Sequence, residues 1–154
     1  MAAGDIHWFN QALLDAGNKI FNLSSDVLKV GLITSAATPA NSTAAPHWGG
    51  TGTTNFATNQ VATGGTSYTG PKTLASVTWT LVSGVATLRA TDISLAQDAS
   101  GFTNARWGII YDDTDANKRA LGYIDLGSDR SIVTGPLTID FGGAGTDILT
   151  LTAS

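Results

Sequence analysis

The chain has 154 residues, a length that suits one domain. Its net charge of −4 argues against binding duplex DNA, which would need a stripe of basic residues. It contains no Cys, so disulfides and thiolate metal sites are excluded. All twelve acidic residues are Asp, and there are 18 Gly. Because Asp and Gly favour turns, this composition predicts a mainly β protein.

The N-terminal segment predicts one short α-helix. Four apolar residues recur at offsets of four, three and four, the spacing of an amphipathic helix: Phe9, Leu13, Ala16 and Ile20. Asp5 can cap the start, and Gly17 with Asn18 is a natural stop, so the expected helix runs from about Ile6 to Ala16. The segment has no positive n-region and the chain has no long apolar run. We therefore expect neither a signal peptide nor a membrane span.

The rest of the pattern is that of β-strands. Val27 to Thr34 reads as a mostly buried strand. Later strands are expected over residues 76–82, 85–91, 92–96, 105–111, 120–126, 136–141 and 148–152. Alternation places Val77, Trp79 and Leu81 on one face of the first of these, and it turns Leu149 and Leu151 inward in the last. This spacing suggests a sandwich or a barrel.

A long segment, Ser35 to Pro71, interrupts the strands with small, polar and aperiodic sequence. Loops of this length are uncommon inside compact domains unless they are functional. This one carries Trp48, Phe56 and Tyr68, although mobile linkers are normally poor in aromatic residues. Two interpretations stay open: the rings pin the segment to its own body, or the segment is an arm that binds another subunit.

The string GGAGTDILT, residues 142–150, fits a calcium-binding β-helix repeat at each fixed position. Calcium in such proteins lies between neighbouring turns, and here the repeat occurs only once. We therefore favour a hairpin in which a Gly-rich turn joins strands 136–141 and 148–152, with Asp147 capping the turn.

The string DDTDAN, residues 112–117, begins like an EF-hand loop but has Lys118 where the loop requires Gly. It is better explained as the connection between two neighbouring strands, and weak cation binding at its tip is the alternative. A hydrolase that uses a pair among Asp112, Asp113 and Asp115 is a further possibility, although nothing distinguishes one Asp pair from another.

The remaining chemistry-bearing residues form no recognisable constellation. His7 and His47 lie in different regions and lack ligand spacing, and no G-x-S-x-G elbow is present. We therefore predict that the protein is not an enzyme and has no catalytic residue, metal ligand or cofactor-binding residue.

Several blocks of the sequence resemble small virion proteins of tailed bacteriophages. These blocks are FNQALLDAGNKIFNLSSDVLKVGLITSA, SYTGPKTLA, RWGIIYDDTDANKRALGYIDLG, GPLTIDF and ILTLT. The resemblance covers most of the chain apart from residues 36–62. Some of these proteins are capsid cement or decoration proteins with β-sandwich or jelly-roll folds. The resemblance therefore implies a jelly-roll-like β-sandwich over residues 1–154.

The resemblance also implies where the protein acts. It would be made in the host bacterial cytoplasm and would then lie on the capsid surface of the virion. There it would bind the major capsid protein and other copies of itself, as a dimer or a trimer, and neither nucleic acid nor a membrane. Because aromatic side chains dominate interface energies, the candidate capsid contacts are Trp8, His47, Trp48, Phe56 and Tyr68. Each could instead be core, which we favour for Trp8. The alternative function is a tail, baseplate or fibre component that binds a host glycan.

Overall fold

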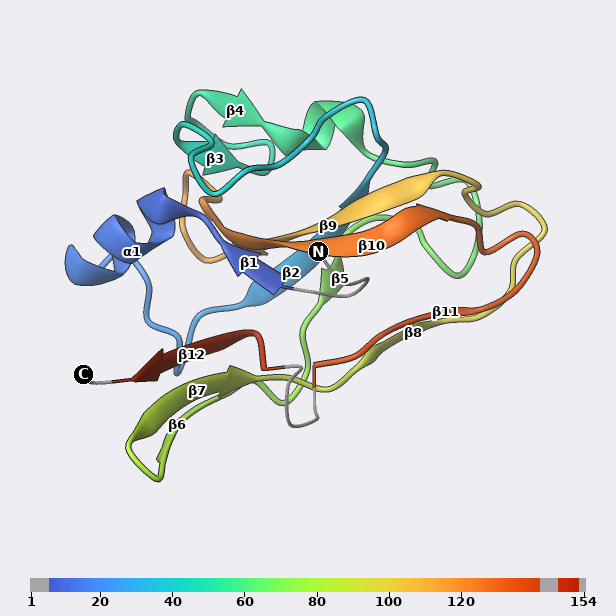
Figure 1. The fold of residues 1–154 in the computed structure, drawn as a ribbon. Coiled ribbons are helices and arrows are strands. Elements are labelled where there is room, and N and C mark those ends of the chain that lie inside the picture. The colour runs from blue at the N-terminus through green and yellow to red at the C-terminus, as the bar shows by residue number, and fades with distance from the viewer. Residues whose placement is uncertain (1–5, 142–146, 153–154) are drawn as a thin grey trace.

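The computed structural model describes residues 6–141 and 147–152. It is mainly β, with 39% strand and 9% helix, as the composition predicts. The elements follow one another as β1 (Ile6–Trp8), α1 (Asn10–Gly17), β2 (Leu28–Ile33), β3 (Pro46–His47), β4 (Thr54–Asn55), the 3-10 helix η1 (Phe56–Asn59), β5 (Lys72–Thr73), β6 (Thr78–Val82), β7 (Val85–Arg89), β8 (Ile93–Leu95), β9 (Ala105–Asp112), β10 (Ala120–Arg130), β11 (Leu137–Ile139) and β12 (Leu149–Thr152) (Figure 1).

The central layer is an antiparallel sheet in the order β1-β10-β9-β2-β5. Its middle strand β9 is buried along almost its whole length, because other segments cover both faces of the sheet. Val30 of β2 pairs with Ile110 of β9, and Tyr123 of β10 pairs with Ile109. The loop 112–117 joins β9 to β10, which confirms the connection predicted from the sequence.

The other strands form smaller sheets. One has the order β12-β7-β6, and β11 pairs with β8; both are antiparallel. These strands lie below the central sheet in Figure 1, whereas β3, β4 and η1 lie above it. The layers are tied together where Trp8 Nε1 of β1 donates to the Ile148 carbonyl oxygen at 2.7 Å.

The N-terminal helix differs from the prediction. It runs from Asn10 to Gly17, and residues 6–8 form β1, which pairs with β10. Phe9 precedes the helix with an extended backbone and no side-chain cap, while Asp5 lies outside the described residues. Pairing with the sheet edge gives residues 6–8 backbone partners that a helix would otherwise supply. The stop at Gly17 and Asn18 is confirmed.

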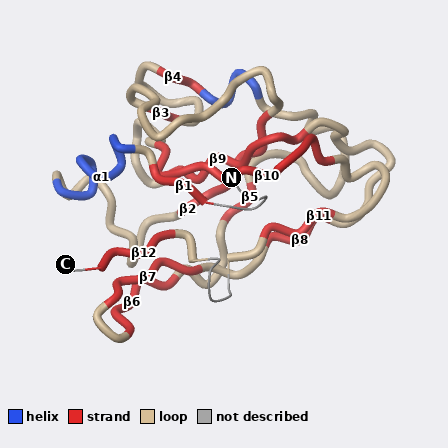
Figure 2. Tube along the Cα trace, viewed as in Figure 1, coloured by secondary structure: helices blue, strands red, loops and turns tan. Residues whose placement is uncertain are grey.

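The segment 35–71 lies on the chain's own body. It is mostly loop, with β3, β4 and η1 as its regular parts (Figure 2). The Trp48 ring covers Gly31 and stacks on Tyr111, with centroids 5.5 Å apart. Tyr68 lies deeper and accepts a hydrogen bond from the Leu32 amide at 2.9 Å. Of the two interpretations, the structure shows the one in which the rings pin the segment.

The predicted C-terminal hairpin is wrong. β11 pairs with β8 and β12 pairs with β7, so the two strands belong to different sheets. Both strands pair with strands more distant in the sequence, and apolar residues lie opposite one another in each pair. Ile139 pairs with Ile93, and Leu149 pairs with Leu88. Residues 142–146 of the proposed turn lie outside the described residues. Asp147 forms an ion pair with Arg89.

Candidate functional site

The acidic loop between β9 and β10 is internally satisfied. Asp112 Oδ1 accepts hydrogen bonds from the amides of Thr114 and Asp115, at 2.7 and 3.2 Å. Asp113 forms ion pairs with Lys29 and Lys118, and these cations lower its pKa. Among residues 6–141 and 147–152, no group of three or more potential ligands is placed to hold a metal ion. The contacts in this loop therefore stabilise the hairpin.

The five residues nominated as capsid contacts lie mostly inside the protein. His47, Trp48, Phe56 and Tyr68 are buried, and Phe56 stacks on Phe9 with centroids 5.8 Å apart. Trp8 is half-buried and reaches the surface of a groove described below. The interface role of the four buried side chains stays a prediction, and it would require them to leave the core.

An apolar groove of about 480 Å³ lies between α1 and the β12-β7-β6 sheet. Residues of α1 and of the segment that follows it form one wall, including Leu13 and Phe21. Trp79 of β6 and Leu149 and Leu151 of β12 form the other wall. We call this surface the apolar groove.

The strand register explains why one wall of the apolar groove is partly covered and partly open. One row across the sheet consists of Trp79, Leu88 and Leu149, and it packs against the chain's own core. The next row on the same face consists of Leu81, Ala86 and Leu151. In this row Leu81 is 73% exposed and Leu151 is 47% exposed. The apolar face therefore extends beyond the part that the protein covers itself.

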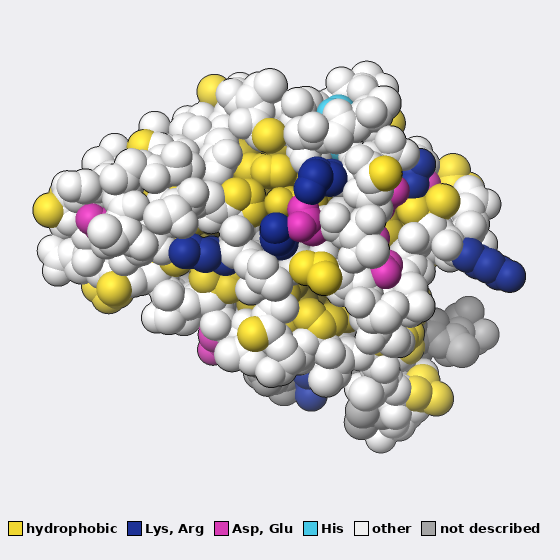
Figure 3. Space-filling view, turned by 180° about the vertical axis from the view of Figure 1, so that it is seen from behind, with side chains coloured by type: hydrophobic (Ala, Val, Ile, Leu, Met, Phe, Trp, Pro, Cys, Tyr) yellow, Lys and Arg dark blue, Asp and Glu magenta, His cyan; other side chains and the backbone are white. Residues whose placement is uncertain are grey.

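The exposed large hydrophobic side chains of the described chain come from elements that border this groove, and two of them, Leu13 and Leu151, line it. The full set is Leu13, Leu14, Ile20, Val27, Leu81 and Leu151. All six come from α1, from the segment between α1 and β2, or from strands β6 and β12, the elements beside the groove. Figure 3 shows that hydrophobic side chains also lie elsewhere on the face seen from behind. An exposed apolar row that continues the wall of a groove is typical of a protein–protein interface.

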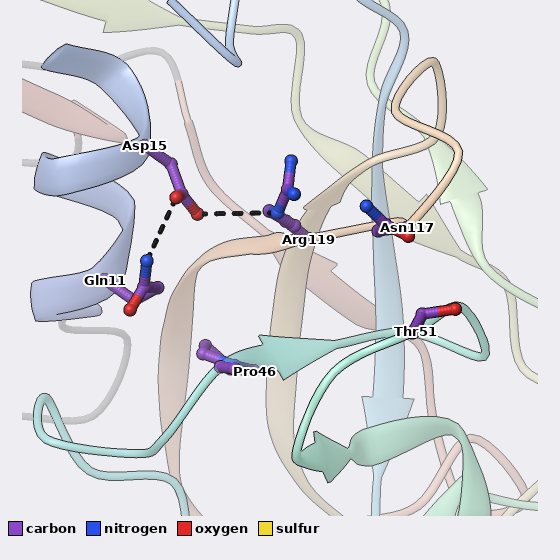
Figure 4. Close-up of a pocket in the computed structure, with 7 residues that line it drawn as sticks. Gln11, Asp15, Pro46, Thr51, Asn117 and Arg119 are labelled. Carbon is purple, nitrogen blue, oxygen red and sulfur yellow. Dashed lines mark hydrogen bonds and ion pairs between the residues drawn. The ribbon is translucent and has the colours of Figure 1, made fainter. Parts of the chain in front are cut away.

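A second, polar cavity of about 350 Å³ lies on the other side of α1, and Figure 4 shows the residues that line it. Gln11 and Asp15 of α1 face Arg119, which immediately precedes β10. Pro46 and Thr51, from the segment above the sheet, form the remaining wall. We call this cavity the Asp15–Arg119 pocket.

Asp15 is the unusual group in this pocket. It is only 5% exposed, and its Oδ1 accepts a hydrogen bond from Gln11 Nε2 at 3.0 Å. Its Oδ2 is buried and has no hydrogen-bond partner. The nearest cation, Arg119 Nε, lies 3.9 Å away, which is an ion pair but too long for a hydrogen bond. A buried carboxylate oxygen without a donor is costly, so the pocket presents an unused acceptor.

The opposite wall of the pocket is built closely against the hairpin. Gly50 packs so near the backbone of Asn117 that no Cβ fits between them. The Trp48 amide donates to the Lys118 carbonyl oxygen at 2.9 Å, which joins the same segment to the hairpin. These backbone contacts hold Thr51 and Asn117 at the pocket without any bound partner.

The chain matches no protein-family model, no curated protein and no solved structure. The resemblance to phage virion proteins therefore stays a prediction. In the described part of the chain, no helix has the length and apolarity to cross a bilayer.

Neither surface is evident from the sequence alone. Asp15 gives no sequence signal, because a lone Asp on a short helix indicates a site only once its distance from Arg119 is known. The groove was partly visible, since alternation places Trp79 with Leu81 and Leu149 with Leu151. The predicted alternation is confirmed, since Leu151 lies on the same face as Leu149, but Leu151 is 47% exposed because the chain covers this row only in part.

Proposed function

We propose that this protein is a capsid cement or decoration protein of a tailed bacteriophage, a structural virion protein that bridges neighbouring subunits of the major capsid protein. The observation that carries the proposal is the apolar groove with its uncovered row, Leu81, Ala86 and Leu151. A partner that lays apolar side chains on this row continues the packing that Trp79, Leu88 and Leu149 begin inside the protein.

A cement protein would stabilise the capsid through the surface that it buries on two neighbouring subunits. A cement protein adds buried area across a subunit boundary, and because it binds the assembled lattice it stabilises that lattice by mass action. The proposal includes the jelly-roll-like β-sandwich predicted from the sequence. The central sheet and the β12-β7-β6 sheet in separate layers support this arrangement, as does the bond from Trp8 to Ile148 between them.

Co-sedimentation with purified expanded heads that lack the protein tests the proposal. We expect the wild-type protein to pellet with the heads. Leu81→Asp should weaken binding by about tenfold or more, because it places a charge on the uncovered apolar row. Thr80→Asp is the matched control, because Thr80 is exposed on the opposite face of the same strand, and it should bind like the wild type. Failure of the wild type to bind heads would defeat the capsid role.

A second candidate function, a tail, baseplate or fibre component that binds a host glycan, is favoured by the Asp15–Arg119 pocket. Electron micrographs with a labelled antibody distinguish the two candidates. Label over the head supports the cement role, and label confined to tails supports the second candidate.

A further inference from the structure

The groups in the Asp15–Arg119 pocket restrict the charge of what can bind there. An anionic ligand would be repelled by Asp15 and by Asp115, which lies 3.4 Å from Arg119 Nη1. A cationic ligand would meet the Arg119 guanidinium. A neutral ligand that offers a hydrogen-bond donor beside an acceptor satisfies both groups.

The hydrogen bonds that remain available point to the same ligand chemistry. Asp15 Oδ2 has no donor, and the contacts of Arg119 with Asp115 and Asp15, at 3.4 to 3.9 Å, are long for a guanidinium. Two adjacent hydroxyl groups fit this pair, because a hydroxyl both donates and accepts. One can donate to Asp15 Oδ2 while its neighbour accepts from Arg119.

The rest of the pocket suits a ring that carries several hydroxyls. Gln11, Thr51 and Asn117 add side-chain donors and acceptors, while Ala45 and Pro46 offer apolar surface to C–H groups. A carboxamide from a partner protein also pairs a donor with an acceptor. However, one planar amide would leave most of a cavity of about 350 Å³, and most of its polar lining, unused.

We propose that the Asp15–Arg119 pocket binds a neutral saccharide unit, with Asp15 Oδ2 and Arg119 holding two neighbouring hydroxyls. This inference rests on the second candidate function, glycan binding, and specifies its ligand and residues, whereas it does not depend on the capsid role. It gives the molecule two separate surfaces, since the apolar groove lies on the other side of α1.

The test is calorimetric titration and saturation-transfer NMR of the purified 154-residue protein. The probes are glucose, galactose, mannose, N-acetylglucosamine and their common disaccharides. We expect saturable binding of at least one of them. Asp15→Asn and Arg119→Gln should each weaken it by about tenfold or more, because each removes a charge-assisted hydrogen bond. Asp129→Asn makes the same change of charge at an exposed position near the far end of β10 and should have no effect.

Three results would overturn the proposal. The first is no binding of any neutral saccharide by the wild type. The second is saccharide binding that survives both pocket substitutions. The third is stronger binding of a blocked glutamine amide, which would assign the pocket to a protein partner. If a variant fails to fold, amide shift mapping on the wild type decides the question. Saccharide-induced shifts must then centre on Asp15, Thr51 and Asn117, and shifts elsewhere contradict the site.

Discussion

Asp112 stabilises the hairpin through hydrogen bonds, but burying its carboxylate costs free energy. It is almost wholly buried, and it accepts two backbone hydrogen bonds within the loop that joins β9 to β10. Burial, together with the neighbouring Asp26 carboxylate, raises the pKa of Asp112 to about 6, although the backbone hydrogen bonds act in the opposite direction. Ionising Asp112 is thus less favourable in the folded protein than in the unfolded chain.

The sign of this effect predicts a pH dependence. Because the folded protein binds this proton more tightly than the unfolded chain does, the free energy of unfolding should rise as the pH falls from 7 towards 4. Asp112→Asn mimics the protonated form and should be more stable than the wild type at pH 7 by about 1–3 kcal/mol. Urea unfolding at several pH values should show this gain disappearing near pH 4. Asp129→Asn is the control, and a gain that is independent of pH would contradict the explanation.

At the scale of elements, the segment 35–71 completes the central sheet where β5 ends. Thr34 and Val61 form backbone hydrogen bonds that join β2 to residues 59–61, with N···O distances of 3.0 Å. Beside them, the Tyr68 hydroxyl accepts from the Leu32 amide and from Gln60 Nε2, at 2.9 and 3.3 Å. A side chain therefore does at this edge what a further strand would do.

Tyr68→Phe should destabilise the protein by about 1–3 kcal/mol, because it leaves the buried Leu32 amide without an acceptor. The measurement is the free energy of unfolding from urea titration. Tyr111→Phe removes the same group from a tyrosine whose ring stacks on Trp48, and because this stacking is kept, the change should affect stability much less. Equal losses in the two variants would show that the segment is held by ring packing alone.

The whole molecule divides into a well-covered centre and an outer sheet with open surfaces. β9 lies between β10 and β2 and is covered on both faces. In the β12-β7-β6 sheet, both outer strands are edges and the row with Leu81 and Leu151 is exposed. Because the free energy of local opening rises with the buried apolar contact of a segment, the β12-β7-β6 sheet should open more easily than the central sheet.

Hydrogen exchange measured by NMR checks this difference. Amides of β7, including that of Ala86, should exchange about tenfold or more faster than those of Ile109 and Ile110 in β9. Adding a partner that covers the apolar groove should slow exchange in β6 and β12 while leaving β9 unchanged. Equal protection of β7 and β9 in the free protein would mean that the outer sheet opens only with global unfolding.

The sequence by itself determined most of the strands and one connection. Alternation and continuous apolar runs located β2 and β9, because a strand buried on one or both faces must carry apolar residues there. The polar string 112–117 between two such runs predicted the hairpin. Local patterns also identified the apolar face of β6, with Trp79 and Leu81 together.

Only the tertiary structure decided which strands pair and which distant side chains come together. Residues 6–8 form a strand because β10 offers them an edge, and β11 and β12 separate because β8 and β7 pair with them instead. Asp15 becomes part of a pocket only through its distance to Arg119, which is 104 positions away in the sequence. A local pattern specifies which face of an element is apolar or charged. What covers that face depends on residues distant in the chain, and their contacts are absent from any short stretch of sequence.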